Sequence, residues 1–134
     1  MNYPSKTFYE QEVERISKVY GLPAYQYALI RQSKAFIVTH HGEKIGVNEM
    51  ADAACMSRFH FIRIFQRVYG ITPRQYLRDV RIEKAKPLLK QGESVSQVCL
   101  KVGYTSLPTF SAAFKRGTGH SPKAYQLINK SNLE

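Results

Sequence analysis

The sequence predicts an all-α fold in which one helical arrangement occurs twice, joined by a linking helix and preceded by a helical N-terminal extension. The main observation is an internal repeat. Residues 57–77 (SRFHFIRIFQRVYGITPRQYL) and 106–127 (SLPTFSAAFKRGTGHSPKAYQL) share the skeleton S-x-x-x-F-x-x-x-F-x-x-x-x-G-x-x-P-x-x-Y, offset by 49 residues. The second observation is the length: 134 residues form one domain or two very small ones, because one core typically serves about 100 to 150 residues.

Two helices are expected before the repeat. The first opens with the capping-box pattern of Thr7 and Glu10 and closes at Gly21 and Pro23, so residues 1–24 read as a helical extension. The second spans about residues 25–41 and closes at Gly42. It opens a first subdomain over residues 25–71.

The first copy predicts a short helix over residues 47–54, a turn at Cys55 and Met56, and a longer helix over residues 58–69. Ser57 is placed as its N-cap, and Gly70 suits the left-handed residue that ends it. A short helix, a tight turn and a longer helix make a helix-turn-helix unit.

The linking helix is expected over residues 72–91, opened by Thr72 and Pro73. Pro87 lacks the backbone N–H and clashes with a carbonyl one turn earlier, so a kink or an early helix end is expected there.

The second copy, within residues 92–128, repeats the pattern before a tail over residues 129–134. A capping box at residues 94–97 opens a short helix to about Val102, and the turn falls at Gly103 and Tyr104. The longer helix should span residues 107–116 after Ser106, and a last short helix should begin at Pro122.

The charge favours a polyanionic partner. The net charge is +10, and residues 1–55 are balanced, with six basic and six acidic side chains. Residues 56–90 hold two acidic side chains, Asp79 and Glu83, against nine basic ones: Arg58, Arg63, Arg67, Arg74, Arg78, Arg81, Lys84, Lys86 and Lys90. The positive charge therefore centres on the first copy and the linking helix.

The face of the helix over residues 58–69 that lies opposite its apolar stripe suits double-stranded DNA. Phe61, Ile64, Phe65 and Val68 share the stripe expected to face the core. The opposite face carries guanidinium, amide and apolar groups: Phe59, Ile62, Arg63, Gln66 and Arg67. In a major groove, Arg reads guanine, Gln reads adenine, and an apolar tip meets a thymine methyl.

Two joint motifs carry a family resemblance: R-x-x-x-A-x-x-L-L at Arg81, Ala85, Leu88 and Leu89, and the run from Gly103 to Lys115 (GYTSLPTFSAAFK). With these motifs, residues 26–127 resemble the DNA-binding domain of AraC/XylS-type transcriptional regulators. The resemblance implies two helix-turn-helix units on a rigid linking helix that set two recognition helices into successive major grooves. It also implies a monomer on DNA and, for a chain of this size, a stand-alone activator that touches RNA polymerase.

By position in that family, Phe59, Ile62 and Arg63 fall on the base-contacting places of the first unit. Arg58, Gln66 and Arg67 are placed for phosphates or neighbouring bases. In the second unit the corresponding places are Leu107, Pro108, Thr109 and Ala112, with Ser111, Lys115 and Arg116 available to the DNA backbone. The second unit departs from the polar residues usual in the family, so shape fit, methyl contacts and phosphate anchoring are expected from it.

Cys55 is a second departure, because the family favours glycine at this turn position. If Cys55 has a positive φ, the left-handed conformation costs roughly 1 kcal/mol. Cys99 aligns with Ala51 on the short helix and is expected to be buried.

Other chemistries are not favoured. No run of 18 apolar residues and no signal-like start occurs, so a soluble, cytoplasmic protein acting on nucleoid DNA is expected, with no membrane partner. The two cysteines form no CxxC pair, the four histidines show no ligand spacing, and no nucleophile elbow or phosphate loop is present. No enzyme activity, cofactor or metal is therefore expected.

Two alternatives to DNA recognition stay open. One is a protein-binding anti-activator that uses the apolar tips Phe59, Ile62, Leu107 and Pro108. The other is a redox-gated regulator in which cations beside Cys55 lower the pKa of its thiol.

Overall fold

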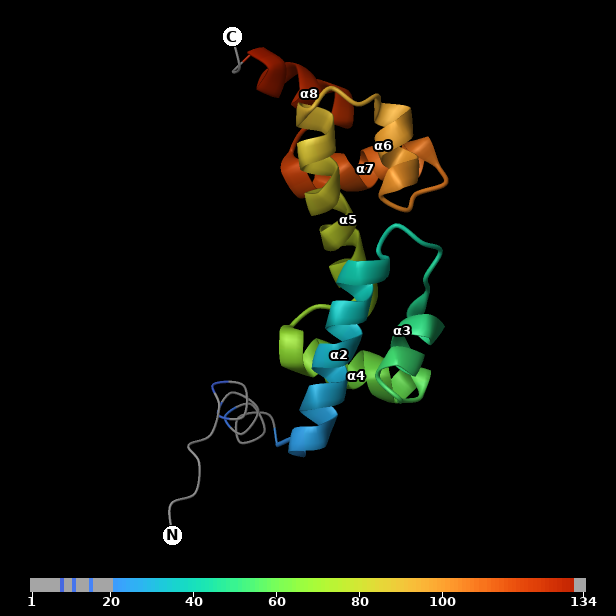
Figure 1. Cartoon of the computed structure of the whole chain (residues 1–134), viewed down its shortest axis with the longest axis vertical. Helices are drawn as coiled ribbons and strands as arrows, with labels where there is room; N and C mark the ends of the chain where they lie inside the picture. Colours follow the sequence, from blue (N-terminus) through green and yellow to red (C-terminus); the bar gives the residue numbers. More distant parts are fainter. Residues whose placement is uncertain (1–7, 9–10, 12–14, 16–20, 132–134) are drawn as a thin grey trace. The chain divides into compact units, whose positions relative to one another are not determined.

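The computed structural model of the chain describes residues 8, 11, 15 and 21–131 (Figure 1). These residues form helices and no strand, in the order α2 (Ala24–His40), α3 (Val47–Ala53), α4 (Arg58–Tyr69), α5 (Pro73–Lys90), α6 (Val95–Lys101), α7 (Leu107–Thr118) and α8 (Pro122–Ser131). The predicted all-α fold class is confirmed. The helix expected over residues 7–20 lies outside the described residues, apart from Phe8, Gln11 and Arg15, which are helical.

The helix boundaries follow the capping residues. The side chains of Ser57, Ser94 and Ser106 each accept a hydrogen bond from the backbone N–H three residues on, at 3.2 to 3.4 Å. Gly70 and Gly119 end α4 and α7 in the left-handed conformation, at φ of 78° and 84°. Each cap therefore satisfies a backbone group that would otherwise lack a partner at a helix end.

Pro87 does not end its helix, which continues to Lys90, so of the two alternatives expected there, a kink or an early helix end, the early end is wrong. The backbone N–H that Pro87 lacks would lie in the last turn of α5. Residues just beyond this turn donate hydrogen bonds back to carbonyls of the helix. Gly92, at φ of 93°, donates its N–H to the carbonyl of Leu89 at 3.0 Å, and Glu93 donates to Leu88 at 3.2 Å. This paired closure satisfies the terminal carbonyls of α5.

The chain divides into two compact units. The first contains the residues through Phe36 and Val47–Pro73; the second contains Ile37–Gly46 and the residues from Arg74 onward. The end of α2 and the following loop therefore belong with the second unit.

The core of the first unit forms where α3 meets α4. The α4 side of this core is the apolar stripe Phe61, Ile64, Phe65 and Val68, all buried. Met50 and Ala51 of α3 are also buried. From α2, Gln32 donates to the carbonyl of Ala53 at 3.0 Å, and the Lys34 ammonium lies 4.5 Å from the centre of the Tyr69 ring. These polar contacts tie α2 to both helices of the motif.

The core of the second unit is formed by buried residues of three helices and one residue next to them: Ile82, Ala85 and Leu89 of α5, Val98 and Cys99 of α6, Val102 directly after α6, and Phe110, Ala113 and Phe114 of α7. Cys99 is 3% exposed, as its alignment with Ala51 predicts. α8 is fixed by Gln126, whose amide donates to the carbonyls of Leu89 and Glu93 at 3.0 and 2.7 Å. α7 thus lies on a nearly solvent-free core.

The two copies differ in one detail of length. Residues 54–57 separate α3 from α4, whereas residues 102–106 separate α6 from α7. The helices α4 and α7 themselves each have 12 residues.

Candidate nucleic-acid interface

The predicted site residues of the first unit lie on the surface of α4. Arg58, Phe59, Arg63, Gln66 and Arg67 are exposed. Phe59 is 79% exposed, which is unusual for a large apolar side chain, and Ile62 is partly exposed. The opposite stripe is buried, so these side chains form the solvent-accessible face of α4.

The predicted residues of the second unit are also accessible. Leu107 (41%), Pro108, Thr109 and Ala112 are exposed on α7. Of the residues expected at the DNA backbone, Ser111 is partly exposed, and Lys115 and Arg116 are exposed.

Thr109 has little donor capacity to offer a base. Its hydroxyl donates to the Ser106 hydroxyl at 3.0 Å, while the Thr109 N–H reaches the same oxygen at 3.3 Å. A threonine hydroxyl has one proton, so the side chain presents a methyl group and an acceptor outward. This internal hydrogen bond could not be seen from the sequence pattern.

Neither α4 nor α7 contains an acidic residue. α4 carries Arg58, Arg63 and Arg67, and α7 carries Lys115 and Arg116. Both exposed faces are therefore positive, which suits phosphate contacts.

Cys55 adopts the left-handed conformation, with φ of 54°, and is the only non-glycine residue with positive φ in the described chain. It closes α3 as Gly103 closes α6. The N–H groups of Cys55 and Met56 bond to the carbonyls of Asp52 and Ala51, both at 3.0 Å. The condition on which the strain at Cys55 depends, a positive φ, is therefore met, and the thiol is exposed.

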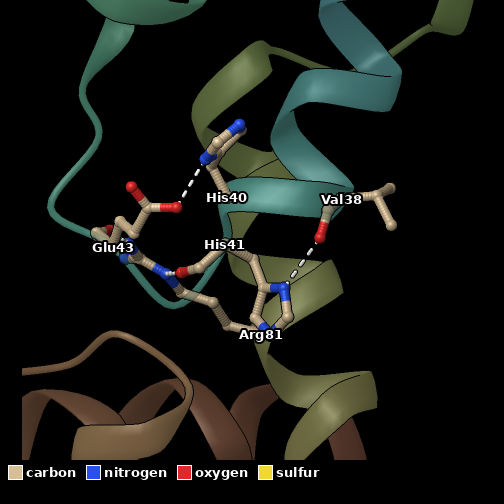
Figure 2. Close-up of polar contacts among 5 residues, drawn as sticks. All are labelled: Val38, His40, His41, Glu43 and Arg81. Atoms are coloured by element: carbon tan, nitrogen blue, oxygen red, sulfur yellow. Dashed lines mark hydrogen bonds and ion pairs between the residues drawn. The ribbon is translucent and has the colours of Figure 1, made fainter.

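Arg81 fixes the α2–α3 loop to the second unit, a role that sequence reasoning missed. Its guanidinium donates to the backbone carbonyls of His41 at 2.8 Å and Glu43 at 3.0 Å (Figure 2). The central guanidinium carbon of Arg81 also lies 5.3 Å from the centre of the Tyr104 ring. Burial lowers the pKa of Arg81 and raises the pKa of Tyr104, and the guanidinium remains charged at neutral pH. We call this group, Arg81 with its two carbonyl acceptors, the Arg81 clasp.

The loop around the clasp is further ordered by two histidines. His41 contacts the carbonyl of Val38 through Nδ1 at 2.8 Å, and His40 pairs with the Glu43 carboxylate (Figure 2). Gly103 lies against the clasp: a Cβ there would come within 2.5 Å of the His41 carbonyl oxygen and 2.8 Å of Arg81 Nε. Glycine is therefore required for space as well as for its φ of 102°.

Within the described part of the chain, no helix is long and apolar enough to cross a bilayer. Nor do its residues bring three or more His, Cys, Asp or Glu side chains together as a metal site.

Comparison with known proteins matches this architecture. A family profile described as a helix-turn-helix domain matches residues 50–127. The HTH-type transcriptional regulator AlkR of Acinetobacter baylyi is 43% identical over 81 residues, covering 60% of this chain and 26% of the relative. LumQ of Photobacterium leiognathi, a probable transcriptional regulator by its name, is 35% identical over 122 residues, covering 90% and 44%. The chain thus spans less than half the length of these relatives.

Among solved structures, the DNA-binding domain of AdpA in complex with a target DNA is similar, with a TM-score of 0.73 and 31% identity. The match covers 77% of this chain and 94% of that domain.

Proposed function

This chain belongs to the AraC-type family of helix-turn-helix transcriptional regulators, and we propose that it activates transcription from a specific double-stranded DNA site, with α4 and α7 in successive major grooves. The observation that carries this proposal is the exposed, acid-free face of α4. Arg63 and Gln66 lie there beside the apolar tip of Phe59. This combination supplies the chemistry that distinguishes base pairs in a major groove.

We propose that the two units divide the recognition. α4 offers Arg63 and Gln66, which can each make paired hydrogen bonds to a purine. α7 offers Leu107, Pro108 and the methyl group of Thr109, because the Thr109 hydroxyl donates its hydrogen bond to Ser106. The second unit therefore favours thymine methyls and anchors phosphates through Lys115 and Arg116.

Paired substitutions on the two helices test the assignment. Arg63→Ala should cost about 1 to 3 kcal/mol on the selected site and relax base preference at one position, since a bidentate base contact is lost. Lys115→Ala should weaken all duplexes alike and reduce the salt slope by about one. The measurement is titration of specific and random duplexes with each variant. Equal losses on both duplexes for Arg63→Ala would refute its role in base reading.

Selection of bound duplexes from a random pool tests the groove spacing. Successive major grooves on one face lie about 34 Å apart, or about 10 base pairs. The selected sites should show two short boxes at that spacing, and inserting five base pairs between them should abolish specific binding. Retained affinity after the insertion would contradict simultaneous reading by both helices.

The exposed apolar tips Phe59 and Leu107 favour one alternative, a protein-binding anti-activator with the same fold. Salt separates the two functions. Affinity for random DNA should fall steeply with salt if several phosphates are neutralised, whereas apolar protein docking should depend on salt weakly.

We also propose, from the family resemblance, that the protein acts as a monomer on nucleoid DNA in the cytoplasm and contacts RNA polymerase there. Sedimentation of the protein with a single selected duplex tests the first point. A mass of one chain per duplex is expected.

A further inference from the structure

The first unit contains an open cleft beside the recognition helix. It has a volume of about 540 Å³, within the range that holds a small organic molecule. One wall is residues 21–23 with Gln26, and the other is a stripe of α4. The cleft is thus formed within one unit, next to the proposed DNA-reading face.

The α4 wall of this cleft is basic. His60, Arg63 and Arg67 line it, and no carboxylate does so among the residues that the structure describes. Guanidinium groups bind carboxylates and phosphates through paired, charge-assisted hydrogen bonds. A ligand with an anionic group therefore complements this wall.

Apolar side chains also line the cleft. Pro23 is exposed on the first wall, whereas its neighbour Leu22 and, on the α4 wall, Ile64 keep only 4% and 7% of their surface accessible. A DNA phosphate would use the arginines and leave this apolar surface without a partner, whereas a ligand with a hydrocarbon body would cover both. The lining therefore favours a small amphipathic acid over a bare phosphate.

We propose that this cleft binds a small organic acid, its anionic group on the basic side chains of α4 and its apolar body against Pro23 and Ile64, and that this binding competes with DNA. The competition rests on the proposed function, because Arg63 and Arg67 belong to both surfaces. A carboxylate held by these guanidinium groups neutralises their charge and occupies N–H donors that a base or phosphate would use. Linkage then requires that DNA weaken acid binding by the same factor as the acid weakens DNA binding.

The test is a calorimetric titration of the full chain with the probe 2-naphthoate, in the absence of DNA. Saturable binding at one probe per chain is expected. Its neutral analogue 2-naphthalenemethanol and inorganic phosphate should each bind about tenfold more weakly, because one lacks the charge and the other the apolar body. An equally tight neutral analogue, equally tight phosphate, or the absence of saturation would overturn the proposal.

Two variants localise the site. Arg67→Gln should weaken 2-naphthoate about tenfold. Arg74→Gln, which removes an exposed guanidinium from α5 outside the cleft, should leave it unchanged. Equal effects of the two substitutions would show that only overall charge attracts the probe and would overturn the site.

A DNA titration with and without saturating 2-naphthoate tests the competition. The affinity for DNA should fall in the presence of the probe, and unchanged affinity would overturn the competition. DNA binding without the probe is a separate readout. Its failure would refute the proposed function while the calorimetric result for the cleft would stand.

Discussion

Replacing Cys55 with glycine should stabilise the protein. The backbone at Cys55 is left-handed, with φ of 54°, which costs a residue with a Cβ roughly 1 to 2 kcal/mol and costs glycine almost nothing. Glycine increases the entropy of the unfolded chain, which offsets about 0.4 to 1 kcal/mol. The Cys55 side chain is exposed, so no buried apolar contact is lost. The expected net gain in the free energy of unfolding is about 0.5 to 1 kcal/mol.

Urea unfolding measures this gain. With a slope of about 2 kcal/mol per molar urea, the midpoint should rise by roughly 0.3 to 0.5 M. Cys55→Ser is the matched control: it removes the thiol but keeps the Cβ, so its midpoint should match that of the parent protein. A midpoint for Cys55→Gly at or below that of Cys55→Ser would refute the argument that backbone strain is stored at this turn.

Three further substitutions test contacts in the second unit and the cap of α4. Gly103→Ala should destabilise the protein by about 3 kcal/mol or more, because a Cβ within 2.5 Å of the His41 carbonyl oxygen adds a clash to the left-handed strain. Urea unfolding measures this loss of stability. A loss below about 1 kcal/mol would contradict the close approach of Gly103 to His41. Arg81→Leu should lower the free energy of unfolding by about 2 to 4 kcal/mol, because it removes two charge-assisted hydrogen bonds. Amide hydrogen exchange should then become faster in residues 41–46. Unchanged exchange there would show that the Arg81 clasp does not order the loop. Ser57→Ala should cost about 1 kcal/mol through loss of the N-cap of α4, measured by urea unfolding against Ser57→Asp, which restores an acceptor; equal losses in both would exclude capping as the cause.

The sequence predicts the helices well because their end signals are local. Ser57, Ser106, Gly70 and Gly119 act within one helical turn, so the repeat locates α4 and α7 without any tertiary information. The same locality explains the buried stripe of α4, which follows directly from helical periodicity.

Contacts between distant segments could not be predicted in this way. Arg81 binds the backbone carbonyls of Glu43 and His41, which lie 38 and 40 positions earlier in the chain. A backbone carbonyl has no sequence signature. The motif containing Arg81 was visible, but its acceptors were not. The cleft is similar: His60, Arg63 and Arg67 are spaced along one side of α4, but only the fold brings Pro23 opposite them.

The turns before α4 and α7 differ in length by one residue. The two helices can therefore be exchanged for one another, whereas fragments that include the turns cannot. Each helix is a 12-residue cassette bounded by serine and glycine, so exchanging Arg58–Tyr69 with Leu107–Thr118 preserves both ends. Exchanging longer fragments that include the turn would import or delete one residue of the turn and so change the path of the chain between the two helices. Hybrids of this scaffold that exchange the two helices should therefore be spliced at Ser57 and Ser106, where the two copies of the repeat begin.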